Sequence, residues 1–99
     1  MSGVFCLGIA TLDYVYSVDT LPTRGEKYRS RDLAVVGGGC AGNASVAIAR
    51  LGGRSWLATR LADDLTGDGI VADLQAEGVD ASGSLRAPGL RSPVSAILV

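Results

Sequence analysis

The sequence has no histidine and only two cysteines, Cys6 and Cys40, among its 99 residues. These cysteines form no CxxC pair, which disfavours a zinc site built from Cys and His side chains. The N-terminus lacks the basic region and the apolar run of a signal peptide. No apolar stretch reaches the roughly 18 residues of a membrane span. We therefore expect a cytoplasmic protein with two reduced thiols.

The sequence also has no excess of charge of either sign. Nine Lys and Arg residues against ten Asp and Glu residues give a net charge of −1, and like charges form no block. This balance disfavours nucleic acid and an acidic membrane surface as partners. A hydrophobic fraction of 47% predicts a folded chain with a core, in one small domain. The apolar run Ser95–Val99 has no turn or cap after it, so we expect the chain to be the front part of a longer protein.

Strand and helix patterns alternate along most of the chain, which predicts an α/β fold with parallel strands. Two half-exposed strands interrupt the alternation early, and we expect them to form a flap outside the main sheet. The predicted strands are 4–7, 13–19, 27–36, 55–62 and 94–99, the predicted helices are 43–51 and 66–77, and 86–93 is a loop or strand pair.

The apolar spacing predicts which side chains are buried. The first strand, 4–7, is uniformly apolar, as expected for a strand buried on both faces. In the first helix Ala44, Ala47, Ile48 and Leu51 share one face, and in the second Ile70, Val71 and Leu74 point inward. Asp63 or Asp64 is expected to cap the second helix, with Gly52 and Gly78 as left-handed ends of the two helices.

The segment 36–45, VGGGCAGNAS, is a glycine-rich loop that leads into the first helix. Glycine leaves the backbone N–H groups open to a small polar ligand. Asn43 adds an amide that both donates and accepts hydrogen bonds. This combination favours a ligand that carries hydroxyls or phosphates.

Two other interpretations of this loop remain open. Gly37, Gly39 and Gly42 fit the G-x-G-x-x-G pattern of dinucleotide-binding folds, and Asp63 and Asp64 follow about 20 residues later. The chain would then be an NAD(P)-binding Rossmann-type oxidoreductase. Alternatively, the glycines form a plain strand-to-helix turn and Asn43 is only a helix cap.

Four motifs in order make the chain resemble the ribokinase (PfkB) family of carbohydrate kinases. The first is a strand and turn that end in Asp13, and the second is a P-x-x-G-E turn. The third is the glycine-rich signature, and the fourth is a D-D-x-x-G helix entry. They occupy residues 8–13, 22–26, 38–52 and 63–67. The resemblance implies a ribokinase-like, Rossmann-like parallel sheet flanked by helices, with a small inserted lid of strands at about 14–36 and 94–99.

The resemblance also implies transfer of a phosphoryl group from ATP to a sugar hydroxyl. Asp13, Thr11 and Asn43 would contact sugar hydroxyls, and the backbone of Gly38 and Gly39 would approach the sugar. Cys40 and Thr11 replace the Lys and Asn of ribokinases proper, and Ala62 replaces a signature Gly. The first two changes disfavour ribose, so a ketohexose or a sulfosugar is preferred as substrate.

The expected lid has two further implications. Lids of this family often pair between subunits, so the resemblance implies a homodimer through the lid. Lys27, followed by Tyr28, is similar to the lid lysine of the sulfofructose kinase branch, which meets the anionic sulfonate. A lysine ammonium suits such an anion. The alternative interpretation is that Lys27 is a solvated lysine on an edge strand.

The resemblance places the catalytic residues outside these 99 residues. The family's catalytic G-A-G-D motif is absent here, and so is a phosphate-binding G-x-x-x-x-G-K-[ST] loop. ATP and Mg²⁺, with a monovalent cation as a further option, would be bound mainly by a C-terminal part. Residues 1–99 would be the N-terminal segment of a single kinase domain. A non-catalytic sugar-binding homologue is a second alternative.

Overall fold

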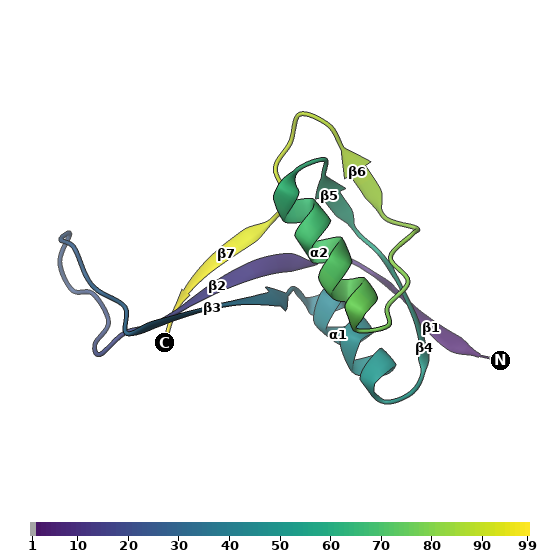
Figure 1. Cartoon of the computed structure of the whole chain (residues 1–99), viewed down its shortest axis with the longest axis horizontal. Coiled ribbons are helices and arrows are strands. Elements are labelled where there is room, and N and C mark those ends of the chain that lie inside the picture. Colours follow the sequence, from purple (N-terminus) through teal and green to yellow (C-terminus); the bar gives the residue numbers. More distant parts are fainter. Residues whose placement is uncertain (1) are drawn as a thin grey trace.

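The computed structural model describes residues 2–99. An α/β part carries both helices, and a narrow sheet extends from it (Figure 1), within overall extents of 53 × 34 × 18 Å. The elements are β1 (Gly3–Leu7), β2 (Thr11–Ser17), β3 (Asp32–Gly38), α1 (Cys40–Arg50), β4 (Arg54–Ala58), β5 (Arg60–Ala62), α2 (Leu65–Ala76), β6 (Leu85–Ala87) and β7 (Val94–Leu98).

The α/β part contains the parallel strands that the sequence predicts. β1 pairs in parallel with β4, and β5 pairs in parallel with β6. The single strand predicted over 55–62 is instead two strands, because the chain breaks at Thr59. The Thr59 N–H donates to the Ser84 hydroxyl at 3.1 Å, whereas its carbonyl accepts from the N–H of Leu85 at 2.9 Å.

The extending sheet, which we call the hairpin sheet, consists of β3, β2 and β7 in that order. β2 and β3 are antiparallel, from Thr11 opposite Gly38 to Ser17 opposite Asp32, and β7 runs parallel to β2. The early strands β2 and β3 therefore lie outside the parallel pairs β1–β4 and β5–β6, as predicted. The second of them begins at Asp32 and not at Lys27. Residues 18–31 form a polar loop, in which the Tyr28 hydroxyl accepts the N–H groups of Thr23 and Arg24 at 3.3 and 3.2 Å.

Helix α1 begins earlier than predicted and buries a different face. Gly42 and Ser45 are its buried residues, whereas Leu51, just beyond its end, is 88% exposed. Small residues on this face allow a close approach to β4, where the Ser55 hydroxyl donates to the Ser45 carbonyl at 2.7 Å. The predicted face, Ala44, Ala47, Ile48 and Leu51, was therefore wrong.

Strand β1 is also less buried than its apolar sequence predicts. Phe5 and Leu7 are 64% and 81% exposed, because within residues 2–99 β4 is the one strand neighbour of β1 and α1 is the helix that packs against it. The core lies instead around β4, β5 and α2. Its buried hydrophobic residues are Ala10, Leu57, Leu61, Ile70, Leu74, Val79 and Ala81.

Helix α2 agrees with the sequence pattern. Ile70 and Leu74 are buried and Val71 packs partly buried against the core. Asp64 is the N-cap, with its Oδ1 accepting the Gly67 N–H at 2.7 Å. The chain leaves the helix at Gly78, whose φ of 87° is the left-handed value expected of a terminal glycine.

We expect the stability of the protein to depend on the charge of Asp64. Hydrogen bonds from the backbone and hydroxyl of Ser92, and from the Gly67 N–H, hold the pKa of Asp64 below its usual value of 3.8. A depressed folded-state pKa means that this stabilisation is complete above the unfolded-state pKa and is lost as the pH falls through the folded value. Asp64→Asn keeps a good N-cap but removes the charge.

The free energy of unfolding should thus differ most between wild type and Asp64→Asn at about pH 7, and this difference should shrink progressively as the pH falls below the usual carboxyl pKa of 3.8. Urea unfolding of the full-length protein at several pH values measures it. A difference of equal size across this range would contradict the assigned role of the charge.

Candidate functional site

The candidate site begins with a carboxylate fixed at the base of the hairpin sheet. The Thr11 hydroxyl donates to Asp13 Oδ1 at 2.6 Å, and Thr11 itself is only 8% exposed. The other carboxylate oxygen lies over Gly38, where an added Cβ would be 2.1 Å from Asp13 Oδ2. Thr11 and Gly38 are directly opposite each other in the β2–β3 register. Thr11 therefore orients the Asp13 carboxylate, and the absence of a side chain at Gly38 leaves space for it.

Two further glycines allow the loop to pass close to the segment between β1 and β2. Gly39 has φ of 87°, and a Cβ there would lie 2.5 Å from the Ile9 carbonyl oxygen. The Gly42 N–H donates to that same carbonyl at 3.1 Å. The glycine-rich pattern thus serves two close backbone approaches as well as the space around Asp13.

Asn43 lies in the first turn of α1. The helix begins at Cys40 with Gly39 as N-cap, and no side chain forms a cap hydrogen bond. The interpretation of Asn43 as a helix cap was therefore wrong, because the helix starts before it. Asn43 is exposed and lines a cavity of about 560 Å³ together with Thr11 and Gly38.

The cavity continues from the glycine-rich loop into the space between α1 and α2. Val46, Ile70 and Leu74 give it apolar walls, and Arg50 and Glu77, which form an ion pair, lie on its lining. Each group of this ion pair stabilises the charged form of the other. The Glu77 carboxylate raises the pKa of Arg50, and the Arg50 guanidinium lowers the pKa of Glu77. Asp13 is not part of this lining but is joined to it through Thr11.

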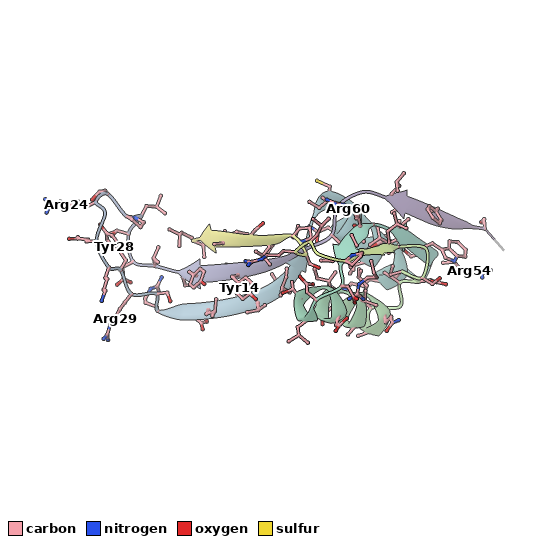
Figure 2. The ribbon with its side chains drawn as sticks, turned by 90° about the horizontal axis from the view of Figure 1, so that it is seen from above. Tyr14, Arg24, Tyr28, Arg29, Arg54 and Arg60 are labelled. Atoms are coloured by element: carbon pink, nitrogen blue, oxygen red, sulfur yellow. The ribbon has the colours of Figure 1, made fainter. Side chains whose placement is uncertain are left out.

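Lys27 is not brought together with the other predicted site residues. It belongs to loop 18–31, which extends past the Ser17–Asp32 end of the hairpin sheet, opposite to the end that holds Gly38. Figure 2 shows its neighbours Arg24, Tyr28 and Arg29 at this far tip. The strand from Asp13 to Ser17 alone spans about 13 Å. Lys27 of the same subunit is thus distant from Asp13.

Ser95 is a site neighbour that the sequence patterns did not indicate. It lies directly opposite Asp13 in the β2–β7 register and is partly buried. Paired residues of adjacent strands share a face, so Ser95 lies on the Asp13 face of the hairpin sheet. The family resemblance placed strand 94–99 in one lid with the strands at 14–36, but no sequence signal gave its parallel register with β2, because the two strands are far apart along the chain.

The local topology does not support the dinucleotide interpretation. That pattern places the glycine-rich loop after a parallel strand, but here the loop follows β3, which is antiparallel to β2. The Asp64 carboxylate is also occupied by hydrogen bonds from Gly67 and Ser92. Asp64 is therefore not free to act as the ribose-binding carboxylate that this interpretation needs.

A family model described as pfkB family carbohydrate kinase matches residues 1–99. The chain belongs to this family. The ribokinase of Bacillus subtilis is 33% identical over 79 residues, which are 80% of this chain and 27% of that protein. The family membership confirms the resemblance drawn from the four motifs.

Solved structures agree in fold. A candidate ribokinase from Agrobacterium tumefaciens is 37% identical with a TM-score of 0.92, over 99% of this chain and 33% of that one. A fructokinase from Xylella fastidiosa, solved with bound ATP, is 25% identical with a TM-score of 0.78, over 98% of this chain and 29% of that one. This chain therefore spans about a third of the length of these relatives, and the ribokinase-like α/β fold is confirmed.

Metal ligands do not cluster in the part of the chain that the structure describes. No three His, Cys, Asp or Glu side chains among residues 2–99 gather in a way that would hold a metal ion. No helix in this segment is long and apolar enough to cross a membrane.

Proposed function

We propose that the full-length protein transfers a phosphoryl group from ATP to a hydroxyl of a small sugar, with a ketohexose as the preferred substrate. Residues 1–99 would be the N-terminal segment of its single kinase domain, in keeping with relatives about three times as long. The observation that carries the proposal is the Asp13 carboxylate, held by Thr11 over Gly38 beside a cavity lined by Asn43. Two free thiols, Cys6 and Cys40, suit the reducing cytoplasm.

The segment supplies binding and orientation. Asp13 has an oxygen that Thr11 does not occupy, and an ionised carboxylate accepts sugar hydroxyls in charge-assisted hydrogen bonds. Asn43 offers an amide donor and acceptor at the edge of the same cavity. ATP, when bound, supplies the transferred phosphoryl group and the leaving group. Positioning of the acceptor hydroxyl is a large part of catalysis in such transfers.

The hairpin sheet would act as a lid over the sugar. Its Asp13 face also carries Val15, Val36 and Ile97, so a sugar bound at Asp13 would lie against an apolar surface. Closing such a surface over the sugar excludes water, and thus limits hydrolysis of ATP.

The opposite face of the hairpin sheet supports the proposed homodimer. It is apolar and partly exposed, with Leu33 and Val35 each 48% exposed. Large exposed apolar surfaces of this kind mark protein interfaces. The residues that share the face are Tyr14, Tyr16, Leu33, Val35, Ala96 and Leu98.

Val35→Asp should convert the full-length protein from a dimer to a monomer, because the interface would bury an unpaired charge. Sedimentation velocity at several concentrations measures the change. Leu21→Asp, an exposed apolar residue of loop 18–31, is the matched control and should stay dimeric. A wild-type protein that sediments as a monomer at all concentrations would contradict the proposed dimer.

A sulfosugar substrate would require Lys27 to reach the sugar. Lys27 lies beyond the far end of the hairpin sheet, so contact with a sugar at Asp13 would need the hairpin of a second subunit. A neutral ketohexose needs no such contact. We therefore place the neutral sugar first and the sulfosugar second.

ADP release with ATP and Mg²⁺ tests the proposed function. The acceptors are fructose, ribose, 6-deoxy-6-sulfofructose, fructose 6-phosphate and adenosine, each supplied to the full-length protein. Turnover of fructose above the others supports the proposal as stated, and turnover of the sulfosugar alone moves the assignment to that branch. Sugar binding without ADP release identifies a non-catalytic homologue, and the absence of both contradicts the proposal.

A further inference from the structure

The chain is tied to the N-terminus of α2 directly before it enters β7. Ser92, 5% exposed, donates its N–H to Asp64 Oδ2 at 2.9 Å and its hydroxyl to Asp64 Oδ1 at 2.7 Å. The Ser92 hydroxyl also accepts the Ala62 N–H at 3.0 Å. Asp64 Oδ1 further accepts the Gly67 N–H at 2.7 Å. One buried serine and one carboxylate thus join three separate pieces of backbone.

The backbone around the Asp64–Ser92 pair is closely packed. A Cβ at Gly67 would lie 2.4 Å from the Ala62 carbonyl oxygen and 2.8 Å from the Ser92 hydroxyl. Arg86 supports the same region by donating its Nε–H to the Ala62 carbonyl at 2.9 Å and pairing with Asp68 at 2.6 Å. Because the surrounding backbone is fixed, the Asp64–Ser92 pair is a rigid point of attachment.

Strand β7, which runs beside Asp13, begins almost immediately after this attachment. The Pro93 carbonyl accepts the Leu12 N–H at 3.1 Å, and the β2–β7 register then places Ser95 opposite Asp13. Only Pro93 and Val94 separate Ser92 from Ser95. A displacement at Ser92 would therefore reach Ser95 and change which groups surround the Asp13 carboxylate.

We propose that the Asp64–Ser92 pair is a positioning clamp that holds β7 against β2, so that the Ser95 hydroxyl completes the sugar site beside Asp13. The inference rests on the proposed sugar kinase function for its substrate, while the clamp itself is a property of the fold. A serine hydroxyl beside a carboxylate adds a second donor and acceptor for the sugar. Ser92 acts through β7 and is a positioning residue, whereas Ser95 would contact the sugar.

Steady-state kinetics of the full-length protein test the role of the clamp in the site. Ser92→Ala and Ser95→Ala should each raise KM for the sugar about tenfold, the loss expected for one hydrogen bond, with kcat and KM for ATP changed less than about threefold. Ser82→Ala is the matched control, since Ser82 donates its N–H and hydroxyl to Asp80 at 2.9 and 2.6 Å but precedes no strand of the hairpin sheet. An unchanged KM with a lowered Tm in Ser92→Ala would overturn the inference.

Hydrogen exchange gives a readout that does not depend on activity. In Ser92→Ala the amides of β7 should exchange at least about tenfold faster than in wild type, whereas those of β4 should not change. Unchanged exchange in β7 would overturn the clamp. A wild-type protein that phosphorylates no sugar would overturn the proposed function and the role of Ser95, while the exchange result still decides the clamp.

Discussion

Asp13→Asn should lower kcat/KM of the full-length protein for its sugar by about 100- to 1,000-fold, with little change in Tm. The variant keeps the size of the side chain and an oxygen for the Thr11 hydroxyl, which donates to it at 2.6 Å in the wild type. It loses the negative charge, and a hydrogen bond to a charged group contributes about 1.5–3 kcal/mol. Two such bonds to sugar hydroxyls account for the expected loss, since about 1.4 kcal/mol corresponds to a factor of ten.

Asp19→Asn is the matched control for this variant. Asp19 lies beyond the far end of β2, where it forms an exposed ion pair with Arg31 at 2.7 Å. Removing an exposed pair of this kind has a small effect, so kcat/KM should stay within about twofold of wild type. Equal losses in the two variants, or a wild-type rate in Asp13→Asn, would show that the carboxylate at position 13 does not bind the sugar.

Gly38→Ala should also abolish most activity, although it adds only one methyl group. The new Cβ would lie 2.1 Å from Asp13 Oδ2 and 2.6 Å from its Cγ. The carboxylate cannot simply swing aside, because Thr11 holds its other oxygen. We expect kcat/KM for the sugar to fall at least about 100-fold, since misplacement of a binding group by about 1 Å has effects of this size.

Gly37→Ala provides an unusually close control. Gly37 is the neighbouring residue of the same strand, and a Cβ there would meet no atom within 4 Å. Both glycines lack a positive φ, so backbone strain is not the difference between them. Gly37→Ala should remain within about threefold of wild type in kcat/KM. Similar losses in both variants would indicate that the strand as a whole, and not the space for Asp13, is sensitive.

The sequence alone was sufficient for the fold class, and it named several residues that the structure brings together in the candidate site. The α/β class with parallel strands and the separate sheet follow from alternation of strand and helix patterns, which are local features. The family that the sequence indicated is confirmed by the family model. It could be recognised from the sequence because its motifs are short and contiguous. Asn43 was placed beside the glycine-rich loop for the same reason, and the structure puts it on one cavity with Thr11 and Gly38.

Features that the sequence could not supply depend on contacts between distant segments. The buried face of α1 is its small-residue side around Gly42 and Ser45, because close backbone packing there outweighs the apolar spacing. Ser95 gains its place from a parallel pairing of β7 with β2 that no local pattern encodes. Lys27 resembles a binding residue in sequence, but the length of the hairpin separates it from Asp13.

The position of a bound sugar in a crystal structure of the full-length protein with ADP and its acceptor sugar tests the central claim most directly. We predict two sugar hydroxyls at about 2.5–2.8 Å from the Asp13 carboxylate oxygens, with the Asn43 amide bonded to the same sugar. Nucleotide phosphates seated on the Gly38–Gly39 backbone, or a sugar bound away from Asp13, would contradict it.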